Sequence, residues 1–500
     1  MSSLMKKTWI GHLLAIFAGG LITLSLAPFN IWPLSLLAPV AFWWLLQNLN
    51  TRQTLLRGWL FGLGVFGSGA SWVYVSIHEH GGTPPLLAGM MTWSFVAGLA
   101  LFFALQAWIW QRWFSKTSVL ISWPALWILM EALRSWLFTG FPWLLLGTAH
   151  LTSPFSGWAP VLGVYGISGL SVLAGLLIFY TLKPSQPIKH RAGSLIFLLV
   201  LIAAGLALKH QQWTQPFGEP LTIGLVQGNI PQEQKWNPAQ RQQIIRQHIQ
   251  LSQQLGEVDL LIWPETALPL LPEQAAPYLQ RALQQAGEQA GLITGLPSRA
   301  EETGRYHNSL ITAGTASGEY HKVKLVPFGE YVPMESQLRG LIEFLDLPMS
   351  SFIPGTVHPA NLQVRDTLVA PLICYEVAYA GFSARQAHQS HWLLTVSNDS
   401  WFGTSIGPLQ HFEMARFRAL EMARPMARAT NNGITALIDH QGQVITRLPQ
   451  FEAAALSGSL QPREGATPFM QTGPLPLWLL CMLLLEWQRY QLRRQLRNCQ

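Results

Sequence analysis

Long apolar runs dominate the first 209 residues, and one more follows near the C-terminal end. The first seven hold roughly 17–25 residues each, the length that crosses the hydrocarbon core of a bilayer as a helix. Only 11% of the chain is charged, whereas soluble domains carry about 25%. The sequence therefore predicts a multi-pass α-helical membrane bundle of eight spans, at residues 9–27, 31–47, 55–78, 86–111, 118–134, 158–182, 193–209 and 474–488.

The first run follows Lys6 and Lys7, as the apolar part of a signal peptide would. No small-x-small cleavage site separates it from the next run, which begins at Ile31. We therefore expect a retained first span.

Basic residues mark one side of the bundle, because loops rich in Lys and Arg stay in the cytoplasm. They fall in every second loop and after the last run, at Lys6, Lys7, Arg52, Arg57, Arg112, Lys116, Lys183, Lys189, Arg191, Arg489, Arg493, Arg494 and Arg497. This pattern predicts cytoplasmic N- and C-termini and places the chain after Lys209 on the other side. It also accounts for the net charge of +7 without nucleic-acid binding.

The composition changes after residue 220, where short β-like runs alternate with polar helical stretches, as in a soluble α/β domain. We expect a seven-span bundle, a linker, an extracytoplasmic α/β domain, an eighth span and a basic cytoplasmic tail. Their ranges are residues 1–209, 210–220, 221–465, 474–488 and 489–500.

Several local patterns carry no separate function in this interpretation. Gly62, Gly64 and Gly67 match a dinucleotide fingerprint, but they lie in an apolar run, where small residues serve helix packing. His78 and His80 have no further ligands nearby, so a solvated turn is expected and no metal site. The charged residues between 413 and 428 have helical spacings and are expected to form surface ion pairs. Glu131 and Arg134 could pair on one helix face or mark a functional site.

The three cysteines, Cys374, Cys481 and Cys499, are too few and too scattered for a disulfide framework. Cys374 stands alone in the polar region, directly after the apolar run 368–373. The run 258–263 leads to Glu265, and a third β-like run, 320–325, contains Lys322 and leads into residues 326–330. Reactive groups of α/β proteins gather at strand ends, so these three side chains are candidates for one catalytic site.

The three residue types suit acyl-transfer chemistry. A free thiol has a pKa of about 8.5 and needs activation at neutral pH. A carboxylate at Glu265 can take the thiol proton, and the ammonium of Lys322 can stabilise the thiolate and an oxyanion. The thioester on Cys374 then passes its acyl group to an amine or to water.

These residues lie in motifs that resemble the carbon–nitrogen hydrolase (nitrilase) superfamily. The motifs are Trp263-Pro264-Glu265-Thr266, the run from Lys322 to Glu330, and Ile373-Cys374-Tyr375-Glu376. Combined with the membrane spans, they resemble the membrane branch of that superfamily, the apolipoprotein N-acyltransferases. The resemblance implies an αββα sandwich on a helical bundle in the bacterial inner membrane, with the sandwich on the periplasmic side.

The resemblance also implies the reaction. Such enzymes move an acyl chain from a phospholipid, usually phosphatidylethanolamine, through a cysteine thioester to the N-terminal amine of an S-diacylglyceryl-cysteine apolipoprotein. We expect a monomer that needs no cofactor or metal.

Further site residues follow from the same motifs. Glu330 is the second carboxylate of the pattern, Tyr375 offers a backbone N–H to the oxyanion, Glu376 follows the nucleophile, and Trp236 lines the acyl site. The family's lysine falls on Lys322. Lys324, two residues on, would share its strand face, so the sequence does not separate the two by geometry.

Two other functions remain open from the residues alone. A membrane-tethered amidase or nitrile hydrolase would use the same site with water as the acceptor. A transporter or scaffold would not need the catalytic residues. The charged residues within the spans are too few, however, to support an ion pathway.

Overall fold

The computed structural model describes residues 9–300, 304–331, 352–356 and 360–498, so Lys6, Lys7 and Cys499 lie outside the described residues. The chain forms two compact units. The bundle unit comprises Met1–Tyr74, Pro85–Gln211 and Thr472–Gln500, and the sheet unit comprises Val75–Pro84 and Gln212–Gln471.

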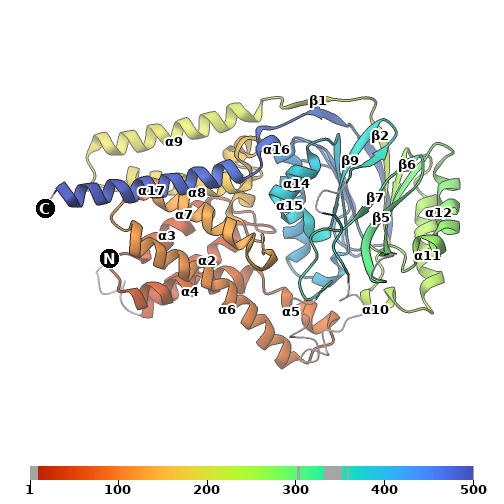
Figure 1. The fold of residues 1–500 in the computed structure, drawn as a ribbon, viewed down its shortest axis with the longest axis horizontal. Coiled ribbons are helices and arrows are strands. Elements are labelled where there is room, and N and C mark those ends of the chain that lie inside the picture. Colours follow the sequence, from red (N-terminus) through yellow and green to blue (C-terminus); the bar gives the residue numbers. More distant parts are fainter. Residues whose placement is uncertain (1–8, 301–303, 332–351, 357–359, 499–500) are drawn as a thin grey trace. The chain divides into compact units, whose positions relative to one another are not determined.

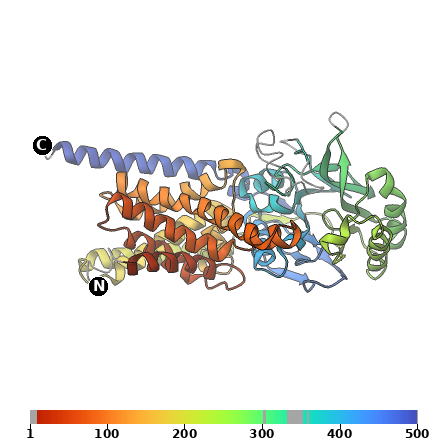
Figure 2. The same cartoon turned by 90° about the horizontal axis from the view of Figure 1, so that it is seen from below.

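Helices make up the described part of the bundle unit (Figure 1). The long ones are α2 (Trp9–Ser25), α3 (Pro33–Leu45), α4 (Thr51–Gly69), α6 (Pro85–Ile109), α7 (Val119–Arg134), α8 (Ala159–Leu182), α9 (Ile188–Lys209) and α17 (Leu475–Asn498). Short helical turns are η2 (Trp110–Phe114), η3 (Leu137–Thr139), η4 (Leu146–His150) and η5 (Pro154–Trp158). Helix α17 packs along α7, and the view turned by 90° shows it lying beside the other bundle helices (Figure 2).

Glycines allow α2, α4 and α6 to approach closely. A Cβ atom at Gly64 would lie 2.0 Å from the backbone oxygen of Ile16, and one at Gly62 would lie 2.6 Å from Cα of Ala100. Because a side chain at either position would clash with backbone, the interpretation of Gly62 and Gly64 as helix-packing residues is confirmed.

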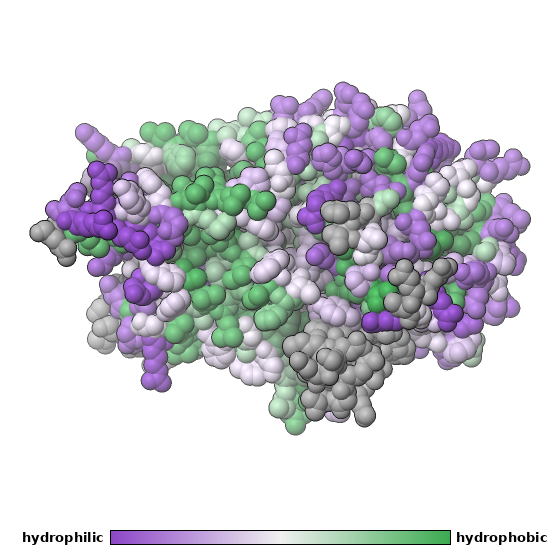
Figure 3. Space-filling view, in the orientation of Figure 1, coloured by the Kyte–Doolittle hydropathy of each residue, from purple (hydrophilic) through white to green (hydrophobic). Residues whose placement is uncertain are grey.

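Three helices of the described chain are long and apolar enough to cross a membrane: Pro85–Phe114, Pro154–Leu182 and Ile188–Lys209. The segments Thr51–Gly69 and Val73–His80 would form a fourth, but they meet at a bend of 61°. The expected span 55–78 is therefore not one continuous helix, because α4 ends at Gly69 and the chain bends before Val73. Helices α2 and α3 are apolar but shorter. Hydrophobic side chains cover much of the visible face of the bundle helices (Figure 3).

The segment Val75–Pro84, which follows that bend, belongs to the sheet unit. It contains η1 (Ser76–His80) and the last residue of α5 (Val73–Val75). Ser76 Oγ donates to the backbone oxygen of Trp401 at 2.7 Å, and His80 Nδ1 lies 3.2 Å from Glu233 Oε1. Both His78 and His80 are half-buried. The expected solvated turn is instead a partly buried helical segment, in which His78 Nδ1 lies 2.8 Å from the Thr83 carbonyl and the His80 ring meets the Trp401 ring edge-on.

The sheet unit contains two large sheets. The first has the strand order β13-β12-β11-β10-β9-β8-β6 and the second has the order β14-β2-β3-β4-β5-β7. Their central neighbours, such as β9 with β10 and β2 with β3, are parallel. The strands are β2 (Leu221–Gln227), β3 (Leu260–Ile262), β4 (Gly291–Arg299), β5 (Tyr306–Gly314), β6 (Ala316–Ser317), β7 (Glu319–His321), β8 (Leu362–Val364), β9 (Thr367–Ile373), β10 (Trp392–Ser397), β11 (Met426–Thr430), β12 (Ala436–Ile438), β13 (Val444–Arg447) and β14 (Ala454–Leu460).

A small two-stranded sheet joins the ends of this unit. Strand β1 (Thr214–Pro216) pairs antiparallel with β15 (Arg463–Gly465). The segment predicted as a linker thus holds a strand, and Thr214 and Arg463 are both buried there.

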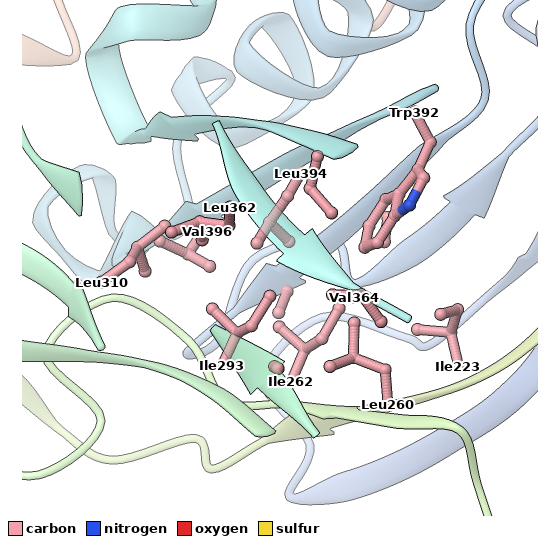
Figure 4. Packing of buried hydrophobic residues seen from close by; sticks show 14 of the residues in the cluster. Ile223, Leu260, Ile262, Ile293, Leu310, Leu362, Val364, Trp392, Leu394 and Val396 are labelled. Carbon is pink, nitrogen blue, oxygen red and sulfur yellow. The ribbon is translucent and has the colours of Figure 1, made fainter. Parts of the chain in front are cut away.

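The two large sheets pack face to face over a hydrophobic core (Figure 4). Ile223, Leu260 and Ile293 from one sheet meet Val369 and Leu394 from the other. A second core lies between the six-stranded sheet and helices α11 (Arg241–Gln253) and α12 (Pro272–Ala286). Helices α14 (Ala380–Ala387) and α15 (Gly407–Met422) contact β9 and β11 of the other sheet. These four layers agree with the predicted αββα sandwich.

The charged residues of α15 and the following strand are not on the surface. Arg418 and Glu421 pair at 3.0 Å with both side chains almost fully buried, and Arg424 and Arg428 are buried as well. The expected ion pairs are present, but the expectation that they lie on the surface is wrong, because α15 packs against both α14 and β11.

In the bundle unit, Glu131 and Arg134 both hold the chain around residues 141–146. Glu131 Oε1 accepts from the Leu146 N–H at 2.9 Å, and Arg134 Nη1 donates to the Phe141 carbonyl at 3.1 Å. These contacts favour a structural role for both residues.

Candidate active site

The three candidate catalytic residues each follow a strand of the sandwich. Glu265 lies three residues beyond the end of β3, Lys322 directly follows β7, and Cys374 directly follows β9. Cys374 has a φ of 54°, in the left-handed region. That conformation is strained for a residue with a side chain, and here it turns the chain from β9 into the helical turn η7 (Cys374–Ala378).

Glu265 is buried and fully engaged by hydrogen bonds. Its Oε1 accepts from Asn308 Nδ2 at 2.7 Å and from Lys322 Nζ at 3.3 Å. Its Oε2 accepts from the Asn398 N–H at 2.7 Å. Burial raises the pKa of Glu265, but the charges of Lys322 and Lys235 and these hydrogen bonds outweigh burial and bring it below its ordinary value. The carboxylate is therefore ionised at neutral pH and can accept a proton.

Lys322 lies between two carboxylates. Its Nζ donates to Glu330 Oε1 at 2.9 Å as well as to Glu265, and the side chain is 1% exposed. Burial lowers the pKa of Lys322, but Glu330 and Glu265 outweigh it and hold the pKa well above its usual value. The residue is thus a permanent cation. Glu330 is held in turn by the Val326 N–H, which donates to its Oε2 at 2.8 Å.

Lys324 has different surroundings. Its ammonium lies 5.4 Å from the centre of the Tyr379 ring, and its backbone N–H donates to Glu376 Oε1 at 3.0 Å. The expectation that it shares a strand face with Lys322 is wrong, because β7 ends at His321. Of the two lysines, Lys322 is the one placed against Glu265.

Cys374 is partly exposed and packs at the edge of the inter-sheet core. Burial and the negative charges of Glu265 and Asp399 raise the pKa of its thiol, although Lys322 acts in the opposite direction. A resting thiol in this environment stays protonated, so attack on a carbonyl requires a base to remove its proton.

Glu376 connects the strand end of Lys322 to that of Cys374. Its Oε1 accepts from the Val323 and Lys324 N–H groups at 2.7 and 3.0 Å. Its Oε2 accepts from the Tyr320 hydroxyl and the Ile373 N–H, both at 2.7 Å. Because Glu376 is fully buried and makes these four bonds, it fixes the distance between the two segments.

The remaining predicted residues lie beside these groups. The ring of Tyr375 is buried and meets that of Tyr379 edge-on at 5.1 Å. Trp236 is half-buried, and its indole N–H makes no hydrogen bond to any described residue. The described contacts of Trp236 include none to Glu265, Lys322 or Cys374, so its place at an acyl site stays a prediction.

Three residues in contact with Glu265 were not predicted as site residues. Asn308 on β5 donates to both Glu265 and Glu330, and Asn398 supplies its backbone N–H to Glu265. Lys235 Nζ donates to the backbone oxygen of Glu265 at 3.1 Å. Lys235 is 2% exposed, and burial lowers its pKa to about 8. A polar residue within the β-like run 306–314 was the available signal for Asn308.

A buried cluster of charged residues contacts the backbone of the nucleophile. Asp399 lies 3.0 Å from His411 Nδ1 and 2.9 Å from Arg428 Nη2, and His411 Nε2 lies 3.0 Å from the backbone oxygen of Cys374. Although burial raises the pKa of Asp399, Arg428 and His411 hold it well below its usual range. The cluster therefore fixes the backbone at the strained Cys374 position.

The geometry combines a protonated thiol that follows β9 of one sheet with an ionised carboxylate and a fixed ammonium that follow β3 and β7 of the other. These groups can carry out nucleophilic acyl transfer with proton transfer through Glu265. No group of three or more metal-ligating side chains occurs among the described residues.

Comparison with known proteins agrees with this description for both units. Residues 18–177 match the apolipoprotein N-acyltransferase N-terminal domain, and residues 222–467 match the carbon–nitrogen hydrolase domain. A mutant amidase of the nitrilase superfamily from Nesterenkonia covers 52% of this chain and 97% of its own, at 18% identity and a TM-score of 0.37. The family assignment rests on the sequence relatives and not on that overlap.

Those relatives match along nearly the whole chain. The apolipoprotein N-acyltransferase of Pseudomonas syringae pv. tomato is 47% identical over 498 residues, which cover 97% of this chain and 98% of the relative. The Pseudomonas aeruginosa protein of the same name is 46% identical over 508 residues, with coverages of 99% and 98%. The chain belongs to the apolipoprotein N-acyltransferase family.

Proposed function

We propose that this protein N-acylates lipoproteins by moving a fatty acyl chain from a membrane phospholipid, through a thioester on Cys374, to the N-terminal amine of an S-diacylglyceryl-cysteine apolipoprotein. The named relatives support the acyltransferase activity. The observation that carries the mechanism is the buried network in which Glu265 and Glu330 share the Lys322 ammonium beside a protonated thiol.

In the first half-reaction, Glu265 takes the proton of the Cys374 thiol as sulfur attacks the ester carbonyl of the donor. Lys322 stabilises the oxyanion, and the Tyr375 N–H is its second proposed donor. The C–O bond then breaks, and the lysophospholipid alkoxide leaves with the proton that Glu265 holds. The products are the thioester, an ionised Glu265 and a neutral lysophospholipid.

In the second half-reaction, the α-amine of the acceptor attacks the thioester carbonyl. An α-amino group has a pKa of about 7.7–8, so part of it is neutral at pH 7. Glu265 removes the extra proton from nitrogen as the C–N bond forms. The C–S bond breaks, and the same proton returns to the Cys374 thiolate. The enzyme ends in its starting state.

The proposed setting is the bacterial inner membrane, with eight spans, both termini in the cytoplasm and the sheet unit in the periplasm. The asymmetry of basic loops supports this orientation. Phosphatidylethanolamine is the proposed donor, and a monomer is the proposed state. An impermeant thiol reagent applied to intact cells should label a cysteine introduced at the exposed Glu273, but not one introduced at the exposed Arg52. The reverse labelling would overturn the orientation.

Acceptor use separates this function from that of an amidase. Purified protein supplied with phosphatidylethanolamine and a diacylated lipopeptide should yield triacylated lipopeptide and lysophospholipid in equal amounts. Release of free fatty acid without any triacylated product would instead identify a hydrolase, in which water resolves the thioester.

A further inference from the structure

A cavity opens at one end of the bundle unit, among α3, α7, α8 and α9. Its volume is about 570 Å³, and all of its lining residues belong to the bundle unit. That volume lies within the range of about 300–1,000 Å³ that ligand sites occupy. The cavity is separate from the candidate active site, whose residues all belong to the sheet unit.

The lining of the cavity has an apolar part and a polar, basic part. Trp43, Leu177 and Phe197 provide apolar walls, whereas Lys189 and His190 stand together at the start of α9. Further polar lining comes from Gln47, Ser115, Thr117, Tyr180 and Gln186. A ligand that fits both parts is amphipathic, with a polar head and an apolar chain.

One polar group in this wall is without a partner. The indole N–H of Trp43 is buried and makes no hydrogen bond to any described residue. A buried donor of this kind costs free energy unless an acceptor reaches it. An oxygen atom of a bound ligand would provide that acceptor.

The charges around the cavity select an anionic head. The bundle unit has two acidic side chains, Glu131 and Glu486, and neither lines the cavity. Lys183 and Arg191 flank Lys189 and His190 along the chain. Basic pockets between membrane helices bind anionic lipid headgroups.

The position along α9 separates the cavity from the catalytic leaflet. Lys189 lines the cavity, and Lys209 at the other end of α9 leads into the sheet unit. Twenty residues of helix rise about 30 Å, which is the thickness of a hydrocarbon core. A lipid headgroup at Lys189 therefore lies in the leaflet opposite the point where the chain enters the sheet unit.

We propose that this cavity binds one anionic phospholipid, with its phosphate at Lys189 and His190 and the start of one acyl chain along Trp43, Leu177 and Phe197. The rest of the lipid lies along the exposed apolar side of α9, where Ile196 is 61% exposed. This site is distinct from the proposed donor site and does not depend on the acyl-transfer mechanism.

Native mass spectrometry of the delipidated full-length protein in detergent tests the proposal, with phosphatidylglycerol and phosphatidylethanolamine as probes at equal concentration. The wild type should retain one phosphatidylglycerol in preference to phosphatidylethanolamine. Lys189→Gln should weaken that binding about fivefold, and Ser194→Trp, which fills the cavity without changing charge, should abolish it. Lys209→Gln removes a lysine from the other end of the same helix and should bind as the wild type does.

Three results of the binding measurements would overturn the proposal. The first is equal retention of the two lipids by the wild type, and the second is unchanged binding in Ser194→Trp. The third is displacement of the lipid by soluble glycerol phosphate, which would show that the site binds phosphate without requiring the acyl chain. Acyl transfer to a lipopeptide should persist in Ser194→Trp. Its loss together with lipid binding would assign the cavity to the donor lipid and contradict a separate site.

Discussion

Lys322 Nζ lies 2.9 Å from Glu330 Oε1, and both side chains are buried. The same ammonium also contacts Glu265 at 3.3 Å, and Asn308 donates to both carboxylates. Two negative charges thus share one positive charge and one amide. In this arrangement Lys322 keeps Glu265 ionised, while Glu330 keeps Lys322 in place.

Replacing Glu330 with Gln should slow acylation of Cys374 by roughly tenfold to a hundredfold, since a hydrogen bond to a charged group contributes about 1.5–3 kcal/mol. The rate is measured by quenched-flow labelling with a phospholipid donor. Glu413→Gln is the matched control, because Glu413 is also buried and paired with an arginine, Arg416, but lies outside the site. Equal rates in the two variants would contradict the positioning role of Glu330.

Replacing Glu265 with Gln should have opposite effects on two reactions of Cys374. The charge of Glu265 raises the pKa of the thiol, so its removal should increase the thiolate fraction and speed alkylation by iodoacetamide. Acyl transfer should fall by at least about a hundredfold, within the range ascribed to a general base. A variant that loses both reactivities would show that the thiol is no longer properly placed, and would argue against the proton-transfer role.

Lys235 should give the sheet unit a distinctive pH dependence. Burial lowers its pKa from 10.5 to about 8. Between those values the unfolded chain binds more protons than the folded one, so the stability of the wild type rises with pH. Lys235→Met removes this effect.

The stability of Lys235→Met relative to the wild type should therefore fall by about 2 kcal/mol from about pH 7.5 to about pH 9.5. Thermal or denaturant unfolding at several pH values measures the difference. Lys209→Met, which changes an exposed lysine, should track the wild type. A difference between Lys235→Met and the wild type that stays constant with pH would contradict a lowered pKa at Lys235.

Glu376→Gln should destabilise the sheet unit and reduce acyl transfer together. The carboxylate accepts four hydrogen bonds, two on each oxygen. An amide nitrogen cannot accept, so two of the four donors lose their partner at a cost on the order of 3 kcal/mol. Thermal unfolding and lipopeptide acylation measure the two effects. A variant with wild-type melting and activity would exclude the proposed bracing role.

The sequence could predict that three reactive residues, Glu265, Lys322 and Cys374, lie at strand ends. Apolar runs indicate buried strands, and reactive groups follow such strands. The four-layer sandwich could be predicted from the motifs through their family resemblance. The choice between Lys322 and Lys324 could not be predicted from the sequence, because it depends on where β7 ends, which is at His321. Strand ends are among the least certain features of a sequence-based prediction.

Contacts made across long sequence separations were also missed. Lys235 and Asn398 reach Glu265 from segments 30 and 133 residues away. Lys235 follows no strand, and although Asn398 directly follows β10, it contributes its backbone N–H and not its side chain to Glu265. The charged residues near 413–428 were placed on the surface because helical spacing identifies one polar face but not a second layer that covers it. The expected span 55–78 runs past the end of α4 because the apolar pattern continues across the bend after Gly69.

The most direct test of the mechanism is the site and fate of the acyl group. Wild-type protein incubated with phosphatidylethanolamine should gain one acyl chain, which peptide mapping should locate on Cys374. A diacylated lipopeptide should then remove that chain from the protein and carry it on its own N-terminal nitrogen. A Cys374→Ala protein that still forms a covalent acyl adduct, or a wild-type adduct that the lipopeptide leaves in place, would contradict the account.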